Sequence, residues 1–285
     1  MKETILTLTC MMFALPCFGF DVTAHPANPT GGEAFVLTIA GNTTGQFKVN
    51  YEKNEYMPYA VNDRKSCIVL PVGIEEYGTK VINVKRFNAG EVVEEKNIEI
   101  DAQKRVLEVV KLTGLDEKMR DKQPMIQEQN DKLLEILKYK STLRLWKSPF
   151  MRPLNSSVST QFATHRKGKT YAYFHKGIDI SAEAGTPIKA TNSGKVVFSK
   201  QNLNVYGNTM VIDHGQGVVS CYFHLGKLLK KEGQVVKKGA VIAKVGSSGW
   251  ATGPHLHFGI YIQGVAVDPI WWEDFTKKDI SSIDS

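Results

Sequence analysis

Short strand-like segments separated by turn residues fill most of this 285-residue chain and restrict its fold more than any other feature. Between residues 21 and 100 these segments are β-branched or alternate apolar with polar residues, and clusters of Gly, Asn and Pro separate them. The same pattern returns after Pro149. Regularly spaced short strands with turn signals are typical of antiparallel β domains. We therefore predict a mainly β protein, with a small N-terminal β-sandwich over residues 20–100 and an antiparallel β domain over residues 148–272.

The segment between these regions, residues 101–147, has a helical pattern. Its apolar residues follow a spacing close to 3.6, at Val106, Leu107, Val110, Leu133, Leu134 and Leu137. Pro124 interrupts the pattern, so we predict a connector of two helices with a break near residues 121–125. The end of the chain, residues 273–285, is expected to be a polar tail from about Phe275.

The first residues, MKETILTLTCMMFALPCFGF, carry a lysine followed by an apolar run too short for a membrane-spanning helix. We interpret residues 1–19 as a secretory signal peptide, with a buried N-terminal helix as the alternative. A lipid-anchor signal is less well supported, because Thr9 and Pro16 stand before the two cysteines where small residues are expected. The interpretation implies a periplasmic or secreted protein without stable membrane insertion after cleavage.

Charge and cysteine content narrow the possible partners. The net charge of +7 comes from dispersed lysines, and no arginine-rich block interleaves with aromatic residues, so nucleic-acid binding is not expected. Cleavage of the signal would remove Cys10 and Cys17 and leave Cys67 and Cys221. Two cysteines so far apart do not form a disulfide framework, and both are predicted to be buried hydrophobic residues.

The segment GPHLHFGI, residues 253–260, carries His255 and His257 one residue apart. Residues i and i+2 of a strand point to the same face, so both imidazoles leave the sheet side by side. Imidazole is the commonest transition-metal ligand among side chains, which raises the possibility of a metal site. A half-exposed strand that happens to carry two histidines is the alternative.

A second pair of ligand-type residues, His175 and Asp179, lies in the segment FHKGIDIS. On a straight strand their Cα atoms would be about 13 Å apart, too far to share one ion easily. Gly177 between them is the residue that permits a bend or bulge. Without such a bend, a surface histidine and a turn aspartate are the expected interpretation.

The remaining histidines are less informative singly. His224 ends an apolar strand and alone would be structural, His214 lies at an apparent hairpin turn and is predicted to be structural or exposed, and His165 lies in a predicted loop. The combination of His-x-x-x-Asp, a strand-end histidine and His-x-His within about 85 residues nevertheless argues against coincidence. Nitrogen and carboxylate ligands favour zinc over calcium or magnesium, with iron and manganese left open.

These motifs resemble the lysostaphin-type (LytM) zinc endopeptidases of bacterial cell walls. The resemblance covers about residues 148–272 and rests on HKGID, GTPIKATNSGKV, YGNTMVIDHGQGVVSCYFHL and GSSGWATGPHLHFGI. It implies a LytM-type catalytic domain that binds zinc through His175, Asp179 and His257. It also implies that His224 and His255 are the catalytic pair beside the metal.

One departure concerns the loop before the first predicted ligand. The family has Phe-Gly followed by Arg, whereas this chain has the run Phe162-Ala163-Thr164-His165-Arg166. This leaves open the detail of the groove rim, not the metal site. The N-terminal strands more weakly resemble a β module of cell-shape endopeptidases from Gram-negative bacteria.

The resemblance implies hydrolysis of peptide bonds in peptidoglycan stem peptides. A Gram-negative envelope would make the target a D-alanyl–diaminopimelate crosslink, with carboxypeptidase action and an interpeptide bridge left open. Zinc would lower the pKa of its water to about 7, and one of the two catalytic histidines would take the proton. Tyr206 and Asn208 are candidate substrate-binding residues of the groove wall, or else they only shape a turn.

Two other functions are compatible with the sequence. A catalytically silent domain could bind the wall or activate another hydrolase, although such relatives typically lack ligands or catalytic histidines that are present here. A latent enzyme, with its groove covered by the N-terminal module or the connector, is the other. The sequence carries no information on oligomeric state.

Overall fold

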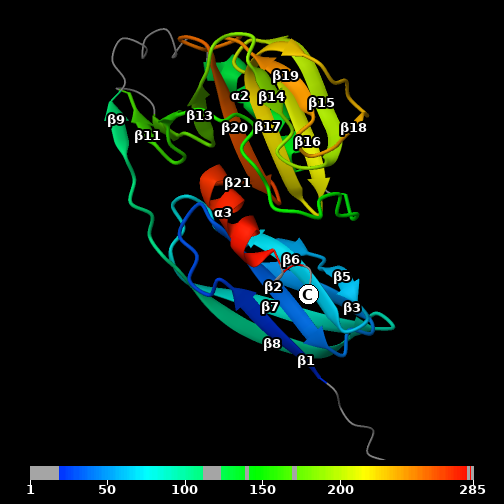
Figure 1. The fold of residues 1–285 in the computed structure, drawn as a ribbon. Coiled ribbons are helices and arrows are strands. Elements are labelled where there is room, and N and C mark those ends of the chain that lie inside the picture. Colours follow the sequence, from blue (N-terminus) through cyan, green and yellow to red (C-terminus); the bar gives the residue numbers. More distant parts are fainter. Residues whose placement is uncertain (1–18, 112–122, 139–140, 169–171, 281–282, 284–285) are drawn as a thin grey trace, which may run out of the picture.

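The computed structural model describes residues 19–111, 123–138, 141–168, 172–280 and 283. The predicted signal peptide therefore lies almost wholly outside the described residues. The predicted mainly β, antiparallel architecture is confirmed: one β-sandwich stands at the N-terminal side, and a larger sheet follows it (Figure 1). None of the described helices is long and apolar enough to cross a membrane.

Two four-stranded antiparallel sheets form the N-terminal sandwich. The first has the order β1 (Phe20–His25), β2 (Ala34–Gly41), β6 (Lys65–Pro71), β5 (Tyr59–Asn62). The second has the order β4 (Asn54–Tyr56), β3 (Gln46–Tyr51), β7 (Gly78–Asn88), β8 (Glu91–Ala102). Their facing side chains form one hydrophobic core, with Phe35, Leu37 and Ile82 fully buried.

The sheet that contains β2 is buried on both faces. Side chains alternate along a strand, so Phe35 and Leu37 enter the sandwich core while Ala34 and Val36 enter a second core shared with the C-terminal region. This accounts for the nearly unbroken apolar run of β2. The sandwich is thus packed directly against the rest of the molecule.

The C-terminal region is built on a ten-stranded sheet. Its main path is β10 (Val158–Thr160), β13 (Ile178–Ser181), β20 (His255–Ile262), β17 (Val218–Leu228), β16 (Gly207–Gly215), β15 (Gly194–Leu203), β18 (Val235–Val236). Three further strands complete the sheet: β19 (Val241–Val245) pairs with β17, β14 (Pro187–Lys189) pairs with β19, and β21 (Val265–Val267) pairs with β20. Cys67 and Cys221 are free and buried, as predicted.

The helix α3 (Pro269–Asp279) lies between the sandwich and the large sheet (Figure 1). The Asp268 side chain accepts hydrogen bonds from two backbone N–H groups of its first turn, and Phe275 is 6% exposed. The prediction of a polar tail from about Phe275 is therefore wrong. The apolar face of this short helix was hidden among lysines and aspartates, and Ile283 beyond it is also buried.

The connector contains one described helix, α2 (Gln123–Leu137). Pro124 is its second residue, where a missing N–H leaves no intrahelical bond unmade, so the helix begins within the predicted break near residues 121–125. The helix predicted upstream is wrong for the described part: Val109–Lys111 forms β9, which pairs in parallel with β11 (His165–Lys167). Strand β11 also pairs with β12 (Ala172–Phe174), giving a three-stranded sheet. Residues 112–122 lie outside the described part.

Candidate metal centre and active site

Strand register brings the main site residues into one row. In the antiparallel pairing of β13 with β20, Asp179 lies opposite His257 and Ser181 opposite His255. In the pairing of β17 with β20, Phe223 lies opposite His257. Directly opposed residues have Cβ atoms about 4.5–5.5 Å apart, so the sheet itself places a carboxylate beside an imidazole.

The chain bends at Gly177 and brings His175 back toward Asp179. Residues 175–177 interrupt the strand, and His175 Nε2 lies 3.0 Å from Asp179 Oδ1. A Cβ atom on Gly177 would stand 2.5 Å from the Phe258 carbonyl oxygen and 2.7 Å from His257 Nε2. Glycine is therefore required here by close approach, and the bend that the sequence suggested is present.

Three ligand atoms form a nearly equilateral triangle. The separations of His175 Nε2, Asp179 Oδ1 and His257 Nδ1 are each 3.0 Å. These residues are the one group in the described part of the chain whose ligand atoms converge in the manner of a metal site. Ligands of tetrahedral zinc, bonded at about 2.0–2.1 Å, lie about 3.3 Å apart, so the triangle is close to the required size.

Proton positions also favour a cation within the triangle. His175 Nδ1 lies 2.9 Å from the carbonyl oxygen of Gln161 and donates to it, because a carbonyl oxygen only accepts. In the neutral ring Nε2 then carries a lone pair that faces the Asp179 carboxylate. Lone pairs aimed at one point repel unless a cation lies between them. The donor set of two imidazoles and one carboxylate therefore fits zinc.

A second histidine pair, His224 and His255, lies beside this triangle with ring centroids 4.9 Å apart. His224 Nδ1 donates to the Ser248 carbonyl and His255 Nδ1 to the Gly253 carbonyl, each at 2.9 Å. Both neutral rings consequently present Nε2 as an acceptor. His255 Nε2 lies 3.9 Å from Asp179 Oδ1, so this nitrogen is close to the triangle without belonging to it.

His224 faces the pocket because its backbone leaves the regular strand conformation. Neighbouring residues of a strand point to opposite faces, yet Phe223 and His224 both line the pocket. The φ angle of His224 is +61°, in the left-handed region that costs energy for a residue with a Cβ. Such strain at a pocket residue points to a functional requirement.

Burial favours the neutral form of His257 and of His224. It lowers the pKa of His257 to about 4 and lowers the pKa of His224, although the Ser248 carbonyl partly opposes the second shift. Burial raises the pKa of Asp179, but contacts with His175 and His257 outweigh it and leave that pKa well below its ordinary value. Neutral imidazoles and an ionised carboxylate are the states that metal ligation requires.

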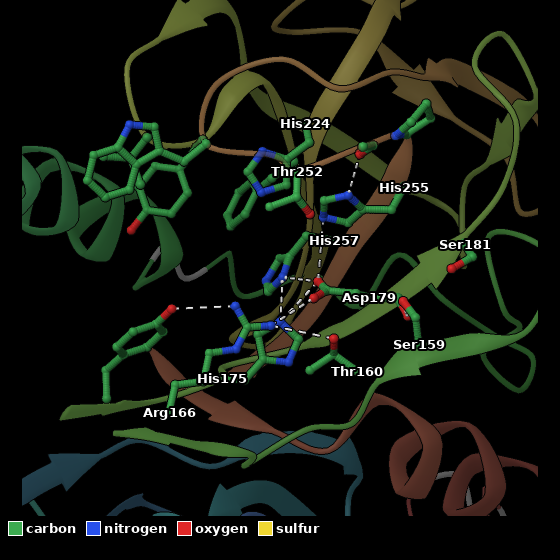
Figure 2. A pocket seen from close by; sticks show the side chains of 17 residues that line it. Ser159, Thr160, Arg166, His175, Asp179, Ser181, His224, Thr252, His255 and His257 are labelled. Carbon is green, nitrogen blue, oxygen red and sulfur yellow. Dashed lines mark hydrogen bonds and ion pairs between the residues drawn. The ribbon is translucent and has the colours of Figure 1, made fainter. Parts of the chain in front are cut away.

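One pocket contains the triangle and the second histidine pair (Figure 2). Tyr206 lines it and packs on Phe223 at 4.7 Å between ring centroids. Asn208 is absent from the lining, and its amide donates to the Leu225 carbonyl at 2.9 Å. The structure thus brings Tyr206, but not Asn208, to the candidate site. The geometry of Asn208 favours the turn-shaping alternative.

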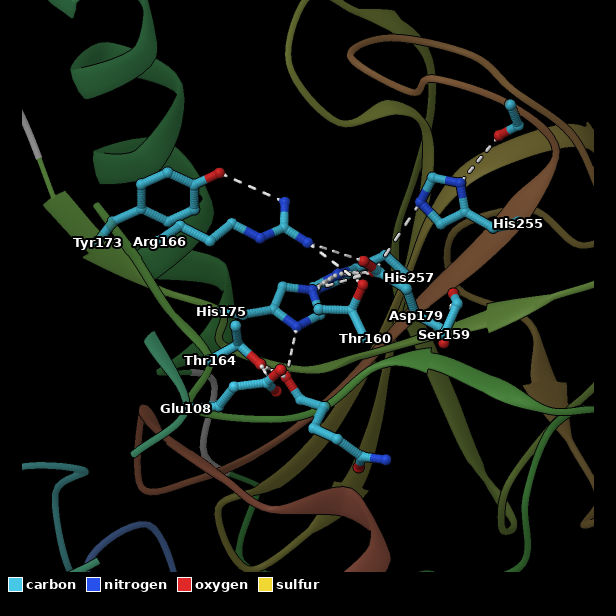
Figure 3. Close-up of polar contacts among 12 residues, drawn as sticks. Glu108, Ser159, Thr160, Thr164, Arg166, Tyr173, His175, Asp179, His255 and His257 are labelled. Atoms are coloured by element: carbon cyan, nitrogen blue, oxygen red, sulfur yellow. Dashed lines mark hydrogen bonds and ion pairs between the residues drawn. The ribbon is translucent and has the colours of Figure 1, made fainter. Parts of the chain in front are cut away.

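The sequence did not single out Arg166 as a site residue. Its guanidinium Nη2 lies 3.2 Å from Asp179 Oδ2, on the side of the carboxylate away from the triangle (Figure 3). Tyr173 and Thr160 contact the same guanidinium. The run FATHRKG offered one weak signal, an arginine close to where the family has one, but nothing in it predicts the direction of the side chain.

The other histidines lie outside the pocket. His214 is fully buried, as a structural residue, with Nδ1 2.8 Å from the Ser193 carbonyl and Nε2 2.8 Å from Ser220 Oγ. His165 stacks on Phe174 in the β11–β12 pair.

Comparison with known proteins identifies the C-terminal region. A family model described as "Peptidase family M23" matches residues 173–269. The peptidoglycan DD-endopeptidase ShyB of Vibrio cholerae is 38% identical over 108 residues, which are 38% of this chain and 25% of that protein. The catalytic domain of lysostaphin from Staphylococcus simulans is 32% identical over 42% of this chain and 93% of that domain, with a TM-score of 0.38.

The chain belongs to peptidase family M23 through this C-terminal region. A crystal structure assigned to peptidase M23 from Pseudomonas aeruginosa covers 86% of this chain and 94% of that one, with a TM-score of 0.57 and 24% identity. That likeness extends the shared fold to most of the chain. The aligned segment spans only a quarter of the Vibrio protein, so likeness to that protein is confined to this region.

Proposed function

We propose that this protein is a zinc-dependent peptidoglycan endopeptidase that acts outside the cytoplasm on D-alanyl–diaminopimelate crosslinks. The observation that carries the proposal is the triangle of His175, Asp179 and His257 with two further histidines, His224 and His255, in the same pocket. Membership of a metallopeptidase family and the DD-endopeptidase name of the Vibrio relative support the substrate class.

His175 Nε2, Asp179 Oδ1 and His257 Nδ1 would hold the zinc ion. When bound, zinc supplies a Lewis acid for the scissile carbonyl and lowers the pKa of a coordinated water to about 7. The Gln161 carbonyl fixes the tautomer of His175 by accepting its Nδ1 proton. Three protein ligands leave a fourth position open, which is the arrangement of a catalytic site.

His224 and His255 would manage the proton and the developing negative charge. Each Nε2 is free to accept a proton while Nδ1–H remains bonded to a backbone carbonyl. Once one ring is protonated, it can donate to the leaving amine. The other ring would stabilise the oxyanion as a hydrogen-bond donor only when it too is protonated at Nε2, because its Nδ1–H is bonded to a backbone carbonyl. The two rings have equivalent hydrogen-bonding arrangements, so we assign both roles to the pair.

The charge of the pocket also suits a wall peptide. Arg166 offsets Asp179, and with neutral histidines a bound divalent ion leaves the site with an excess of positive charge. Diaminopimelate carries a free carboxylate next to the crosslink. An extended stem peptide would pass between Tyr206 and Tyr173, which line the pocket on different elements.

The test is metal content and muropeptide digestion, measured together on the parent protein, His257→Ala and His214→Ala. Near-stoichiometric zinc and cleavage of crosslinked dimers are expected in the parent and lost in His257→Ala. His214→Ala removes a fully buried imidazole away from the pocket and should retain zinc. A parent without zinc would overturn the proposal, whereas zinc without cleavage would favour the silent or latent alternative.

A further inference from the structure

Arg166 makes its shortest contact with a proposed metal ligand. Its Nη2 group donates to Asp179 Oδ2 at 3.2 Å and approaches Thr160 Oγ1 at 3.5 Å, while Nη1 lies 3.4 Å from the Tyr173 hydroxyl (Figure 3). The Arg166 side chain is 27% exposed and that of Asp179 is 11% exposed. A charge-assisted hydrogen bond at this depth is stronger than a surface ion pair and restricts both partners.

The strand that carries Arg166 is not part of the large sheet. Strand β11 lies between β12 and β9, and β9 comes from the connector that leaves the N-terminal sandwich. All three residues of β9 are exposed, so its attachment to β11 depends on backbone pairing. That pairing begins where the His165 N–H donates to the Glu108 carbonyl at 2.7 Å, and the Glu108 carboxylate lies 3.5 Å from Thr164 Oγ1.

We propose that Arg166 is a positioning residue for the metal ligand Asp179 and that the connector strand β9 holds it in place. The inference rests on the proposed function, because it assumes that the triangle binds zinc. By occupying Oδ2, Arg166 fixes the carboxylate so that Oδ1 alone points into the triangle. Partners of this kind orient the ligand and are typically worth about 10–100-fold in metal affinity.

The connector thereby becomes part of the site. In a parallel pair every second residue of a strand turns its backbone groups to the partner. Because the Glu108 carbonyl faces β11, the Val110 N–H also faces β11, and the Val109 N–H points to the open edge. The connector that leaves the N-terminal sandwich thus pairs directly with the strand that carries Arg166.

Arg166 is tested by zinc affinity, measured by competition with a chelator on the full protein. Arg166→Gln is expected to weaken zinc binding about 10–100-fold, and Arg166→Lys to recover only part of the loss, because an ammonium lacks the planar fork of a guanidinium. Lys167→Gln is the matched control, since it removes one positive charge from the same strand on the opposite face. Its affinity should equal that of the parent.

The connector is tested with two proline variants one residue apart. Val110→Pro removes an N–H that faces β11 and should weaken zinc binding several-fold, whereas Val109→Pro removes one that faces outward and should not. The thermal midpoints of the zinc-free variants identify any general loss of folding. Equal affinities of the two proline variants would overturn the role of β9.

The outcomes separate this inference from the proposed function. If the parent binds zinc and Arg166→Gln binds it equally well, the positioning role is wrong and the endopeptidase proposal is untouched. If the parent binds no zinc, the proposed function fails first. A selective loss in Arg166→Gln and Val110→Pro, with Lys167→Gln and Val109→Pro unchanged, is the result expected from the structure.

Discussion

Two regions of the same sheet bury histidines, and only one of them resembles a metal centre. Burial lowers the pKa of His214 and of His257 to about 4 in each case, so ionisation does not distinguish them. Their partners do. His214 has a carbonyl to receive its Nδ1 proton and a hydroxyl at Nε2, whereas His257 Nδ1 faces a carboxylate and another imidazole nitrogen.

The comparison shows that the match of hydrogen-bond donors to acceptors distinguishes a metal-site histidine from a structural one better than burial or pKa does. At His214 every polar atom is satisfied within the protein, which is the usual state of buried polar groups. In the triangle the lone pair of His175 Nε2 faces the Asp179 carboxylate, so this contact joins two acceptors without a donor between them. A site that is unsatisfied by its own protein is one that a ligand can complete.

The largest effect is expected at the shared carboxylate. Asp179→Asn keeps the shape of the side chain but removes its charge, and zinc affinity should fall by more than the ~100-fold that is the upper end for an outer partner. Hydrolysis of muropeptide dimers should fall to background. Metal content after dialysis measures the loss, with His214→Gln as the control. If Asp179→Asn retained zinc, the triangle would no longer differ from the surroundings of His214 as a metal site.

The next largest effect, on turnover, distinguishes the catalytic histidines from the metal ligands. His224→Ala and His255→Ala should each lower turnover about 10²–10⁴-fold, the range for a general acid or base. Zinc content should remain that of the parent, because neither ring belongs to the triangle. Turnover and bound metal measured on the same samples provide the check. Loss of zinc from His224→Ala would contradict the division of roles.

A smaller effect is expected from the glycine that creates the bend. In Gly177→Ala the new methyl group would meet the Phe258 carbonyl at 2.5 Å and His257 Nε2 at 2.7 Å, so the ring must move. We expect zinc affinity to fall about 10–100-fold, as for a displaced ligand contact. Gly253→Ala is the control, because nothing lies within 4 Å of the added atom. Equal affinities would show that the bend tolerates a side chain.

Features set by local pattern were predictable from the sequence. Alternation and turn residues predicted the β architecture, and Gly177 between His175 and Asp179 predicted the bend. His-x-His predicted one shared face, which the register of β20 confirms. The roles of these residues in binding zinc and in catalysis remain predictions.

Features set by contacts distant in sequence were not predictable. Strand β9 exists because β11, more than fifty residues away, offers it an edge. Its valines fit a helical spacing only by chance over so short a segment. Arg166 belongs to the site for the same reason, since its direction depends on that pairing. Phe275 is buried through ring contacts that include His25 of the sandwich, about 250 residues away in sequence, which its polar sequence neighbours do not reveal.

The smallest effect on hydrolysis is expected at His214, where the contrast instead concerns stability. The pKa of His214 is about 4 in the folded protein against an ordinary 6.5. Above pH 6.5 the ring is therefore neutral in the folded and in the unfolded chain, and its burial costs no stability through ionisation. As the pH falls from 6.5 to 4, only the unfolded chain gains the proton, and stability is lost. The separation corresponds to about 3 kcal/mol.

His214→Gln should remove this part of the pH dependence while leaving muropeptide hydrolysis at pH 7.5 nearly unchanged. Urea unfolding of zinc-free parent and variant between pH 7 and pH 4 measures the difference, and the other histidines cancel because both proteins contain them. Parallel pH profiles would mean that His214 can be protonated without unfolding. His214 and His257 would then differ in their hydrogen-bond partners, while the pH dependence of stability would no longer show that the fold keeps the His214 ring neutral.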